Sequence, residues 1–448
     1  MKSKNLDISL PPSKLYELIN EEYVNSFLLE STEGEERLAR FSLIGFDPKK
    51  HIIANGKIVK INDCEEEIDK PIEKIKQNVR NEKIHGEGFF GGAVGYFSYE
   101  YFGNIEKVGL EIKKDMNFPD FEFGIFDDCI VYDHKSGTIR YLYENEDRSS
   151  QITKLATRNQ MDKRTFVAGE IREDIDMEEY CRIVEEAKEH IKSGDIFQVV
   201  LSRRYEFEAK GNPIDVYNYL KKTNPSPYMF YLSFGERKVM GASPENLVRV
   251  EGNKIDSYAT LAGTRPRGKT NEEDKRIENE LKKDEKERAE HLMLVDLTRN
   301  DIGKIAKVGT VKVNRLMSVT KFSHVQHLSS HIQAELADGN DCYKVFNAIF
   351  PAGTLTGAPK IRAIEIIKAL EKNSRGPYGG AVGYFSNNGN CDFAITIRSM
   401  MINNQKAYIQ AGAGIVYDSI PENEFKETEN KAKALINALG EINEGSIN

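Results

Sequence analysis

Apolar side chains recur three and four positions apart in several stretches of the chain, which predicts amphipathic helices. The pattern covers 177–192, 278–301 and 343–350. Alternation of apolar and polar residues predicts a hairpin at 129–143 and paired strands at 238–263. Because the strands are mixed irregularly with the helices, the pattern favours an α+β fold over a doubly wound parallel sheet.

One segment occurs twice in the chain. The octamer GGAVGYFS spans 91–98 and 379–386. A glycine pair ahead of an alternating apolar run is typical of a strand that starts at a bulge or at a close backbone contact. Two copies are too few for a solenoid, so we expect one such strand in each of two related layers or sheets.

A polar stretch follows the first predicted hairpin. Residues 144–177 contain few large apolar side chains, and we place a boundary there. The predicted organisation is therefore an N-terminal region at 1–150, a polar connection at 151–175 and a larger region at 176–440.

Composition narrows the class of protein. The 448 residues carry a formal net charge of −8 without a concentrated basic face, which argues against a nucleic-acid partner. No apolar run approaches the length of a membrane span and the N-terminus lacks the pattern of a leader, so we expect a cytoplasmic protein. The five cysteines form no C-x-x-C pair, which argues against disulfides or zinc and predicts reduced thiols.

The glycine-rich stretch PAGTLTGAPK at 351–360 is not a nucleotide-binding loop. Only three residues separate Gly353 from Gly357, and Ile361 stands where a Ser or Thr would reach Mg²⁺. Pro359 removes an N–H donor and fixes φ, which suits the rigid start of a helix. Another ligand must explain the glycines.

Two pairs of glutamates could hold a cation. Glu287 and Glu290 lie three residues apart on one face of a predicted helix. Glu424 and Glu427 repeat this spacing in a second helix, with Lys431 one turn further on. Mg²⁺ prefers a few carboxylates together with water and a substrate oxyanion. The alternative is that these glutamates are surface ion-pair partners.

A further acidic residue, Glu245, follows a proline in the apolar stretch GASPENLV. A carboxyl group kept dry near other carboxylates has a raised pKa and can donate a proton at neutral pH. A turn residue explains Glu245 equally well. Small residues at 260–268 and 410–418 let the backbone approach a ligand closely, although tight turns alone also account for them.

These segments belong to a longer series of motifs: LLES at 28–31, IFQVVLSRR at 196–204, NPSPYMFYL at 224–232, GASPE at 241–245, LAGTRPRG at 261–268, EHLMLVDLTRND at 290–301, FPAGTLTGAPKIRA at 350–363 and GAGIVYDSIPENEFKETENKA at 412–432. In wording and order, the series resembles anthranilate synthase component I among the chorismate-utilising enzymes. The resemblance covers nearly the whole chain. It implies a two-layer sandwich of orthogonal, mainly antiparallel sheets with helices outside.

The resemblance implies a magnesium site and a chorismate site. Glu290 and Glu427 are then the Mg²⁺ ligands, with Glu287 and Glu424 as their inner neighbours, and one carboxylate of chorismate lies on the cation. Charge-assisted contacts would hold the second carboxylate and orient the ring. The implied substrate contacts are Gly263, Thr264, Tyr378, Arg398, Gly412, Ala413, Gly414 and Lys431.

The resemblance also assigns catalytic roles. Glu245 is implied to be the general acid that protonates the departing ring hydroxyl while ammonia adds to the ring. His327 is implied to assist the later loss of pyruvate, although a structural histidine is the alternative and His324 lies three residues earlier. Thr354 is implied to lie near the substrate, in the wall formed by PAGTLTGAPK.

Two positions discriminate among the relatives. Isochorismate- and salicylate-forming enzymes use a lysine to activate water where this chain has Gln198, which cannot act as a base. Many enzymes of the para-aminobenzoate branch use a lysine nucleophile where this chain has Ala262. We therefore expect anthranilate as the product. Aminodeoxychorismate synthase component I is the alternative, and a receptor without catalysis is a third interpretation.

An inhibitory site for L-tryptophan is implied as well. It would be an apolar slot with a few polar anchors, although a strand entering the core also explains SFLLES. Lys49 and Lys50 have no assigned role, and the absence of tryptophan from the chain suits an enzyme made when this amino acid is scarce. The implied contacts are Leu29, Glu30, Ser31, Pro227, Tyr228 and Met229.

Ammonia needs a source. A class I glutaminase uses a cysteine in a tight glycine-flanked elbow, and none of the five cysteines has glycine on both sides. We therefore expect a separate glutamine amidotransferase subunit, and activity of this chain alone on free ammonia.

Overall fold

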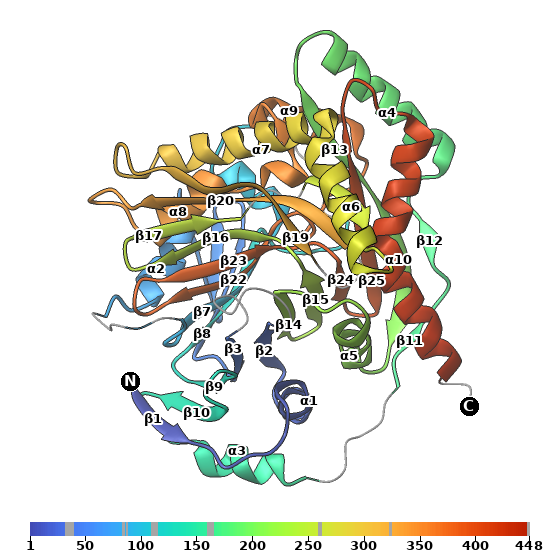
Figure 1. Cartoon of the computed structure of the whole chain (residues 1–448). Helices are drawn as coiled ribbons and strands as arrows, with labels where there is room; N and C mark the ends of the chain where they lie inside the picture. The colour runs from blue at the N-terminus through green and yellow to red at the C-terminus, as the bar shows by residue number, and fades with distance from the viewer. Residues whose placement is uncertain are drawn as a thin grey trace.

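The computed structural model describes residues 1–31, 40–82, 86, 88–108, 115–158, 165–258, 262–321 and 325–445. The described strands form two large antiparallel sheets surrounded by helices, which confirms the α+β prediction. Figure 1 shows α7 (Glu285–Gly303) and α9 (Lys360–Leu370) above the strands, α10 (Pro421–Gly445) along one side, and α1 (Pro12–Glu22) and α3 (Ser149–Ala156) below.

The first sheet combines strands from both halves of the chain. Because β2 pairs with β14, the regions predicted at 1–150 and 176–440 share this sheet. The order is β1 (Lys2–Asn5), β10 (Thr138–Tyr143), β9 (Cys129–Asp133), β3 (Phe41–Phe46), β2 (Asn25–Glu30), β14 (Tyr228–Phe234), β15 (Arg237–Ser243), β24 (Ser399–Asn403), β25 (Lys406–Ile415), β13 (Gln198–Lys210) and β11 (Val167–Ala168), with β12 (Arg172–Glu173) and β21 (Gly357–Ala358) also on β13.

The second sheet contains the repeated octamer. The order is β18 (Ala262–Pro266), β20 (Val325–Glu335), β17 (Lys254–Ser257), β16 (Asn246–Glu251), β23 (Cys391–Ile395), β22 (Ala381–Ser386), β7 (Gly92–Phe97), β8 (Phe121–Phe126), β4 (Lys50–Asn55), β5 (Ile58–Ile61) and β6 (Cys64–Glu67), with β19 (Lys312–Lys321) on β20. The two copies, β7 and β22, pair with each other, with Gly95 opposite Gly383. The expectation of two separate layers is therefore wrong. A Cβ at either glycine would lie 2.0 Å from a backbone oxygen of the next strand, so close strand packing explains the repeat.

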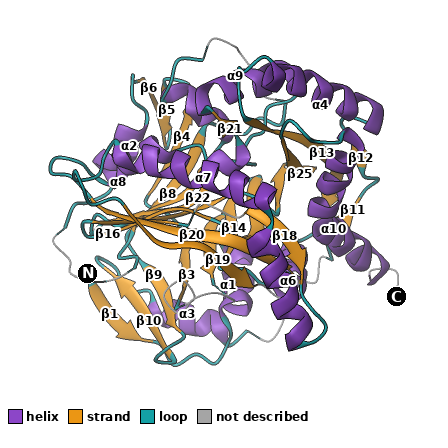
Figure 2. Cartoon of the chain, turned by 45° about the horizontal axis from the view of Figure 1, so that its top comes forward, coloured by secondary structure: helices purple, strands orange, loops and turns teal. Residues whose placement is uncertain are grey.

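Two apolar cores stabilise the sheets. The larger core contains many phenylalanines, and the ring centroids of Phe97 on β7 and Phe346 on α8 (Cys342–Ile349) lie 4.2 Å apart. The second core packs α1, α5 (Ile214–Thr223) and α10 against the first sheet through Leu15, Tyr217 and Leu435. Figure 2 shows the result, with helices outside and strands between them.

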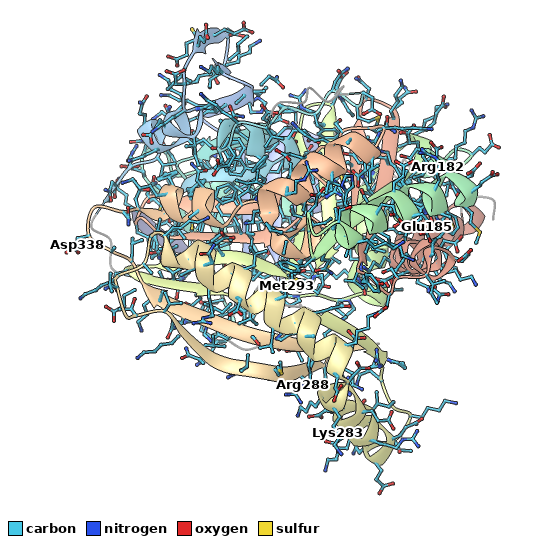
Figure 3. The ribbon with its side chains drawn as sticks, turned by 90° about the horizontal axis from the view of Figure 1, so that it is seen from above. Arg182, Glu185, Lys283, Arg288, Met293 and Asp338 are labelled. Atoms are coloured by element: carbon cyan, nitrogen blue, oxygen red, sulfur yellow. The ribbon has the colours of Figure 1, made fainter. Side chains whose placement is uncertain are left out.

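The predicted helix at 278–301 consists of two helices. Helix α6 (Asn271–Lys283) ends at Asp284, and the Asp284 carboxylate accepts a hydrogen bond at 3.1 Å from the Glu287 N–H at the start of α7. An aspartate at this position satisfies a helix N-terminus that would otherwise lack acceptors. Figure 3 shows α7, with Arg288 and Met293, crossing the molecule, and α6, with Lys283, projecting from it.

The predicted helices at 177–192 and 343–350 are confirmed as α4 (Met177–Lys192) and α8. The remaining helices are α2 (Ile72–Asn78) and the short 3₁₀ turns η1 (Tyr99–Asn104) and η2 (Gly353–Leu355). Pro359 directly precedes α9, as predicted. Within the described residues, no helix has both the length and the apolar character to cross a membrane.

Candidate active site

The two glutamate pairs lie together in the structure. Burial raises the pKa of Glu290 to about 7, and the negative charges of Glu287, Glu424 and Glu427 add to this rise, while Lys286 opposes it. The helical period explains the placement, because Glu287 and Glu290 continue the buried stripe of α7 towards its N-terminus. The faces of α7 and α10 are therefore near enough for the charges of their glutamates to interact.

The donor set of this cluster fits Mg²⁺. Glu287 accepts a hydrogen bond from Arg265 at 3.0 Å and Glu427 forms an ion pair with Lys431 at 2.7 Å, whereas no hydrogen bond joins Glu290 to any of the described residues. In the described part of the chain, no three acidic, histidine or cysteine side chains are close enough to form a ready-made metal site. Mg²⁺ needs only one or two carboxylates when water and a substrate anion complete its shell, so carboxylates from two helices suit it.

Gly263 links the glutamates to His327. A Cβ at Gly263, whose φ is 62°, would lie 2.9 Å from a carboxylate oxygen of Glu287. The backbone of Gly263 hydrogen-bonds the His327 ring, and Thr264 pairs with His327 between β18 and β20. Burial first, and then the nearby charge of Arg398, lowers the pKa of His327 to about 4. His327 is therefore neutral at neutral pH and can accept a proton.

Two glycines of β25 form one wall of the site. Ser202, opposite Gly412, donates its N–H to Glu371 at 2.7 Å, and Val200, opposite Gly414, donates its N–H to a backbone oxygen at 2.9 Å. In an antiparallel ladder such pairs point their N–H groups away from each other. The N–H groups of Gly412 and Gly414 therefore point away from β13, while that of Ala413 faces it.

The same wall contains two of the predicted substrate contacts. The side-chain nitrogen of Lys431 lies 2.9 Å from the Gly412 carbonyl. The Tyr378 hydroxyl lies 3.0 Å from the position of a Cβ at Gly412, so any larger residue there would touch it. Burial raises the pKa of Tyr378, which stays protonated and can donate a hydrogen bond.

Arg398 is a half-buried cation without a counter-ion among the described residues. Burial lowers the pKa of its guanidinium, and Tyr378 offsets part of this effect. Its φ of 50° lies in a region that residues with side chains rarely adopt, and such strain clusters at functional sites. A guanidinium in this state is prepared for a carboxylate ligand, because it has the planar donor geometry that a carboxylate accepts.

Glu245 and Thr354 meet at the opposite wall. Glu245 is 4% exposed, and its carboxylate accepts a hydrogen bond from the Thr354 hydroxyl at 2.9 Å. Thr354 lies in η2, where Gly353 packs so closely against α7 that a Cβ would lie 2.4 Å from Leu297. Glu245 lies in the short connection between β15 and β16, as the turn alternative expects, but its side chain is buried there.

The predicted inhibitor contacts all line a second cavity, together with Phe41, Arg249 and Asp392. The side chains of the predicted contacts point to opposite faces of the sheet, because successive residues of a strand alternate between its faces. Leu29 and Tyr228 belong to the core between the sheets, whereas Met229 belongs to the outer core. The Glu30 carboxylate turns to the outer face, where it accepts hydrogen bonds from Tyr217 at 2.6 Å and Lys221 at 2.8 Å.

The chain matches a known protein family. The family model for chorismate binding enzymes matches residues 24–437. The chain belongs to the chorismate-binding enzyme family. It is 46% identical over 432 residues to anthranilate synthase component 1 of Methanothermobacter marburgensis, which covers 96% of this chain and 92% of the relative. It is 38% identical to aminodeoxychorismate synthase component 1 of Bacillus subtilis, over 92% of this chain and 91% of that protein.

The fold agrees with a solved member of the chorismate-binding family. The crystal structure of anthranilate synthase component I from Streptococcus pneumoniae superimposes with a TM-score of 0.81 and 36% identity, over 90% of this chain and 93% of that one. The prediction of family membership is therefore confirmed.

Sequence analysis missed three polar residues near the second cavity of this chorismate-binding enzyme. Arg249 and Asp392 line the cavity, and the buried Asn246 hydrogen-bonds Asp392. Asn246 directly follows Glu245, which is the signal that could have drawn attention to it. Lys49 and Lys50 instead contact Asp127 and Asn78, while His324 and the side chain of Thr264 lie outside what the structure describes.

Arg398→Met is expected to stabilise the fold while weakening substrate binding. The substitution removes a half-buried charge without a partner, so the unfolding temperature rises by a few degrees. The KM for chorismate rises roughly 10- to 100-fold, since a hydrogen bond to a charged group contributes about 1.5–3 kcal/mol. Thermal unfolding and initial rates measure the two effects. A lower unfolding temperature together with an unchanged KM would contradict the assignment.

Proposed function

We propose that the chain is the large component of an anthranilate synthase, which aminates chorismate and releases pyruvate to give anthranilate, the first committed step towards tryptophan. Three observations support the proposal: the Glu290 cluster, the unpaired Arg398 near His327, and the buried pair of Glu245 and Thr354. The names of the relatives support the same reaction.

The side chains of this site suit each step of that reaction. Arg398 and the Tyr378 hydroxyl bind one substrate carboxylate, and the N–H groups of Gly412 and Gly414 lie beside it. Glu245, held by Thr354, donates a proton to the ring hydroxyl, which leaves as water while ammonia forms a C–N bond to the ring. Neutral His327 then accepts the ring proton as the enolpyruvyl group departs.

Glu290 and Glu427 would hold Mg²⁺ in this proposal, with Glu287 and Glu424 beside them. When bound, the cation supplies a fixed positive charge that neutralises the glutamates and orients the second substrate carboxylate. The raised pKa of Glu290 fits this role. Burial and the neighbouring glutamates disfavour its negative charge, and a bound cation would stabilise that charge.

Two positions favour anthranilate as the product: Gln198 argues against a water-adding, isochorismate-forming enzyme, and Ala262 argues against aminodeoxychorismate synthase. Gln198 lies against Gly414 in the site, where its amide can donate and accept but cannot act as a base. Position 262 holds alanine, so the chain lacks a nucleophilic lysine there. Aminodeoxychorismate synthase remains the second candidate, because one relative at 38% identity bears that name.

A product assay separates the two candidates. The purified chain, with chorismate, Mg²⁺ and an ammonium salt, is expected to release pyruvate and to form a fluorescent aminobenzoate. Activity should rise with pH as more neutral ammonia becomes available, and glutamine should not replace ammonium, because we propose a separate glutaminase subunit. An aminated product that keeps its enolpyruvyl group would favour the second candidate, and no product would favour a receptor.

We also propose that the second cavity binds L-tryptophan as a feedback inhibitor. Its lining is mainly apolar, as an indole requires, with a few polar groups to hold the amino acid. Ser31 contributes a buried hydroxyl without a hydrogen-bond partner among the described residues, which a ligand could supply.

Ser31→Leu is expected to weaken tryptophan binding about tenfold or more, because overfilling a packed site costs about 1–3 kcal/mol. Indole fluorescence measures the binding directly, since the chain contains no tryptophan. Glu30→Gln is the matched control, because its side chain faces Tyr217 and Lys221 outside the cavity. Its tryptophan affinity should stay within about threefold. Equal losses of tryptophan affinity in both variants would contradict the conclusion that Ser31 faces the cavity and the Glu30 side chain faces away from it.

A further inference from the structure

Asn246 connects the second cavity to the site of Glu245. Its side-chain nitrogen donates hydrogen bonds to the Tyr228 hydroxyl at 2.7 Å, to a carboxylate oxygen of Asp392 at 3.3 Å and to the Phe393 carbonyl at 3.3 Å. Tyr228 donates to the same Asp392 oxygen at 3.0 Å. Tyr228 and Asp392 line the cavity, while Asn246 is only 2% exposed. The buried amide is therefore bound to two groups that a ligand in the cavity can reach.

The contacts of Glu245 complete the connection. Its carboxylate accepts the hydrogen bond from Thr354 in the active site, and its carbonyl accepts one from the Ile395 N–H at 3.0 Å. Ile395 and Asp392 lie on the same strand, β23. Both Glu245 and Asn246 are thus hydrogen-bonded to β23, the strand that carries Asp392.

The start of β16 pairs irregularly with β23. The register between β16 and β23 shifts between Asn246 and Val248, which marks an irregularity of the ladder. An irregular pair of strands can re-aim a side chain without breaking the rest of the ladder. A small shift at Asn246 therefore changes the direction of the neighbouring Glu245.

One oxygen of Asp392 is the point of competition. The Arg249 guanidinium faces its other carboxylate oxygen at 3.8 Å. An ammonium group in the cavity that binds the first oxygen competes there with Tyr228 and Asn246. An amino acid carries such a group.

We propose that Asn246 is a positioning residue that transmits occupation of the second cavity to Glu245. The inference rests on the proposed function of the two sites. A ligand ammonium bound to Asp392 displaces the hydrogen bond from Asn246, the start of β16 shifts, and Glu245 loses its alignment with Thr354. The cavity ligand and chorismate then weaken each other's binding, because each favours a different arrangement of this segment.

Equilibrium dialysis of labelled L-tryptophan tests the proposal on the full chain, with Mg²⁺, with or without saturating chorismate, and without an ammonia source. For the unchanged protein, chorismate should raise the Kd for tryptophan by about 5- to 150-fold, the usual size of an allosteric coupling. For Asn246→Ala, chorismate should change this Kd by less than about twofold. The Kd without chorismate should stay within about tenfold, since Asp392 and Tyr228 are retained.

Asn347→Ala is the matched control, because Asn347 accepts a hydrogen bond from Tyr101 at 3.2 Å elsewhere in the protein. It should keep the full coupling. Persistent coupling in Asn246→Ala overturns the inference, whereas absence of tryptophan binding in the unchanged protein overturns the proposed inhibitory site on which it rests. If Asn246→Ala does not fold, Asn246→Ser, whose hydroxyl is too short to reach Asp392, replaces it in the same two measurements.

Discussion

Glu290→Gln is expected to lower kcat/KM for chorismate roughly 10³-fold, because polarisation by a bound metal contributes several kcal/mol and each 1.4 kcal/mol corresponds to about tenfold. The substitution keeps the shape of the side chain and removes its charge. Glu290 is the right target because burial, together with the surrounding glutamates and against the opposing charge of Lys286, raises its pKa to about 7. Initial rates over a titration with Mg²⁺ measure the effect.

A control and a chelator sharpen this test. Glu285→Gln changes an exposed glutamate in the first turn of the same helix, away from the cluster, and should leave the rate within about twofold. Glu290→Gln should also raise the unfolding temperature, since it removes buried like charges. A chelator should abolish the activity of the unchanged protein. Normal turnover in the chelator, or in Glu290→Gln, would refute a metal at this site.

Glu245→Gln is expected to lower kcat by roughly 10²- to 10⁴-fold with little change in KM, because a positioned proton donor contributes about this much to the rate. Glutamine fits the same buried space and still accepts the hydrogen bond from Thr354. It cannot deliver a proton to the leaving hydroxyl. Steady-state rates of pyruvate release measure kcat and KM separately.

Variants at Thr354 separate the proton donor from its orientation. Thr354→Val removes the hydroxyl that lies 2.9 Å from Glu245, and kcat should fall less than in Glu245→Gln. Thr354→Ser restores the hydroxyl and should recover most of the rate. Equal rates in the valine and serine variants would show that this hydrogen bond has no part in the reaction.

The structure decided between alternatives that the motifs left open. Helical spacing placed Glu287 and Glu290 on one face but was equally compatible with surface ion pairs. Burial raises the pKa of Glu290, and the charges of Glu424 and Glu427, from a helix more than 100 residues away, add to this rise, so the two faces lie near each other. Likewise, the sequence could not show that Glu245, in the connection between β15 and β16, is buried and contacts Thr354.

The repeated octamer illustrates the opposite case. Its pattern predicted two strands correctly, yet their arrangement in separate layers was wrong, because β7 and β22 lie side by side. Periodicity reports which residues share a face, and it does not report which strand is the neighbour. The crowding of Gly95 and Gly383 by adjacent strands arises only once the sheet is assembled.

The amino-acid sequence by itself determined the features that depend on near neighbours in the chain. These are the helices at 177–192 and 343–350, the rigid start of α9 after Pro359, and the absence of a glycine-flanked cysteine. Tertiary structure alone decided which face of β2 lines the second cavity and how Asn246 joins that cavity to Glu245. The physical reason is that helix periods and caps are set within a few residues, whereas strand register and packing are set by residues far apart in the chain.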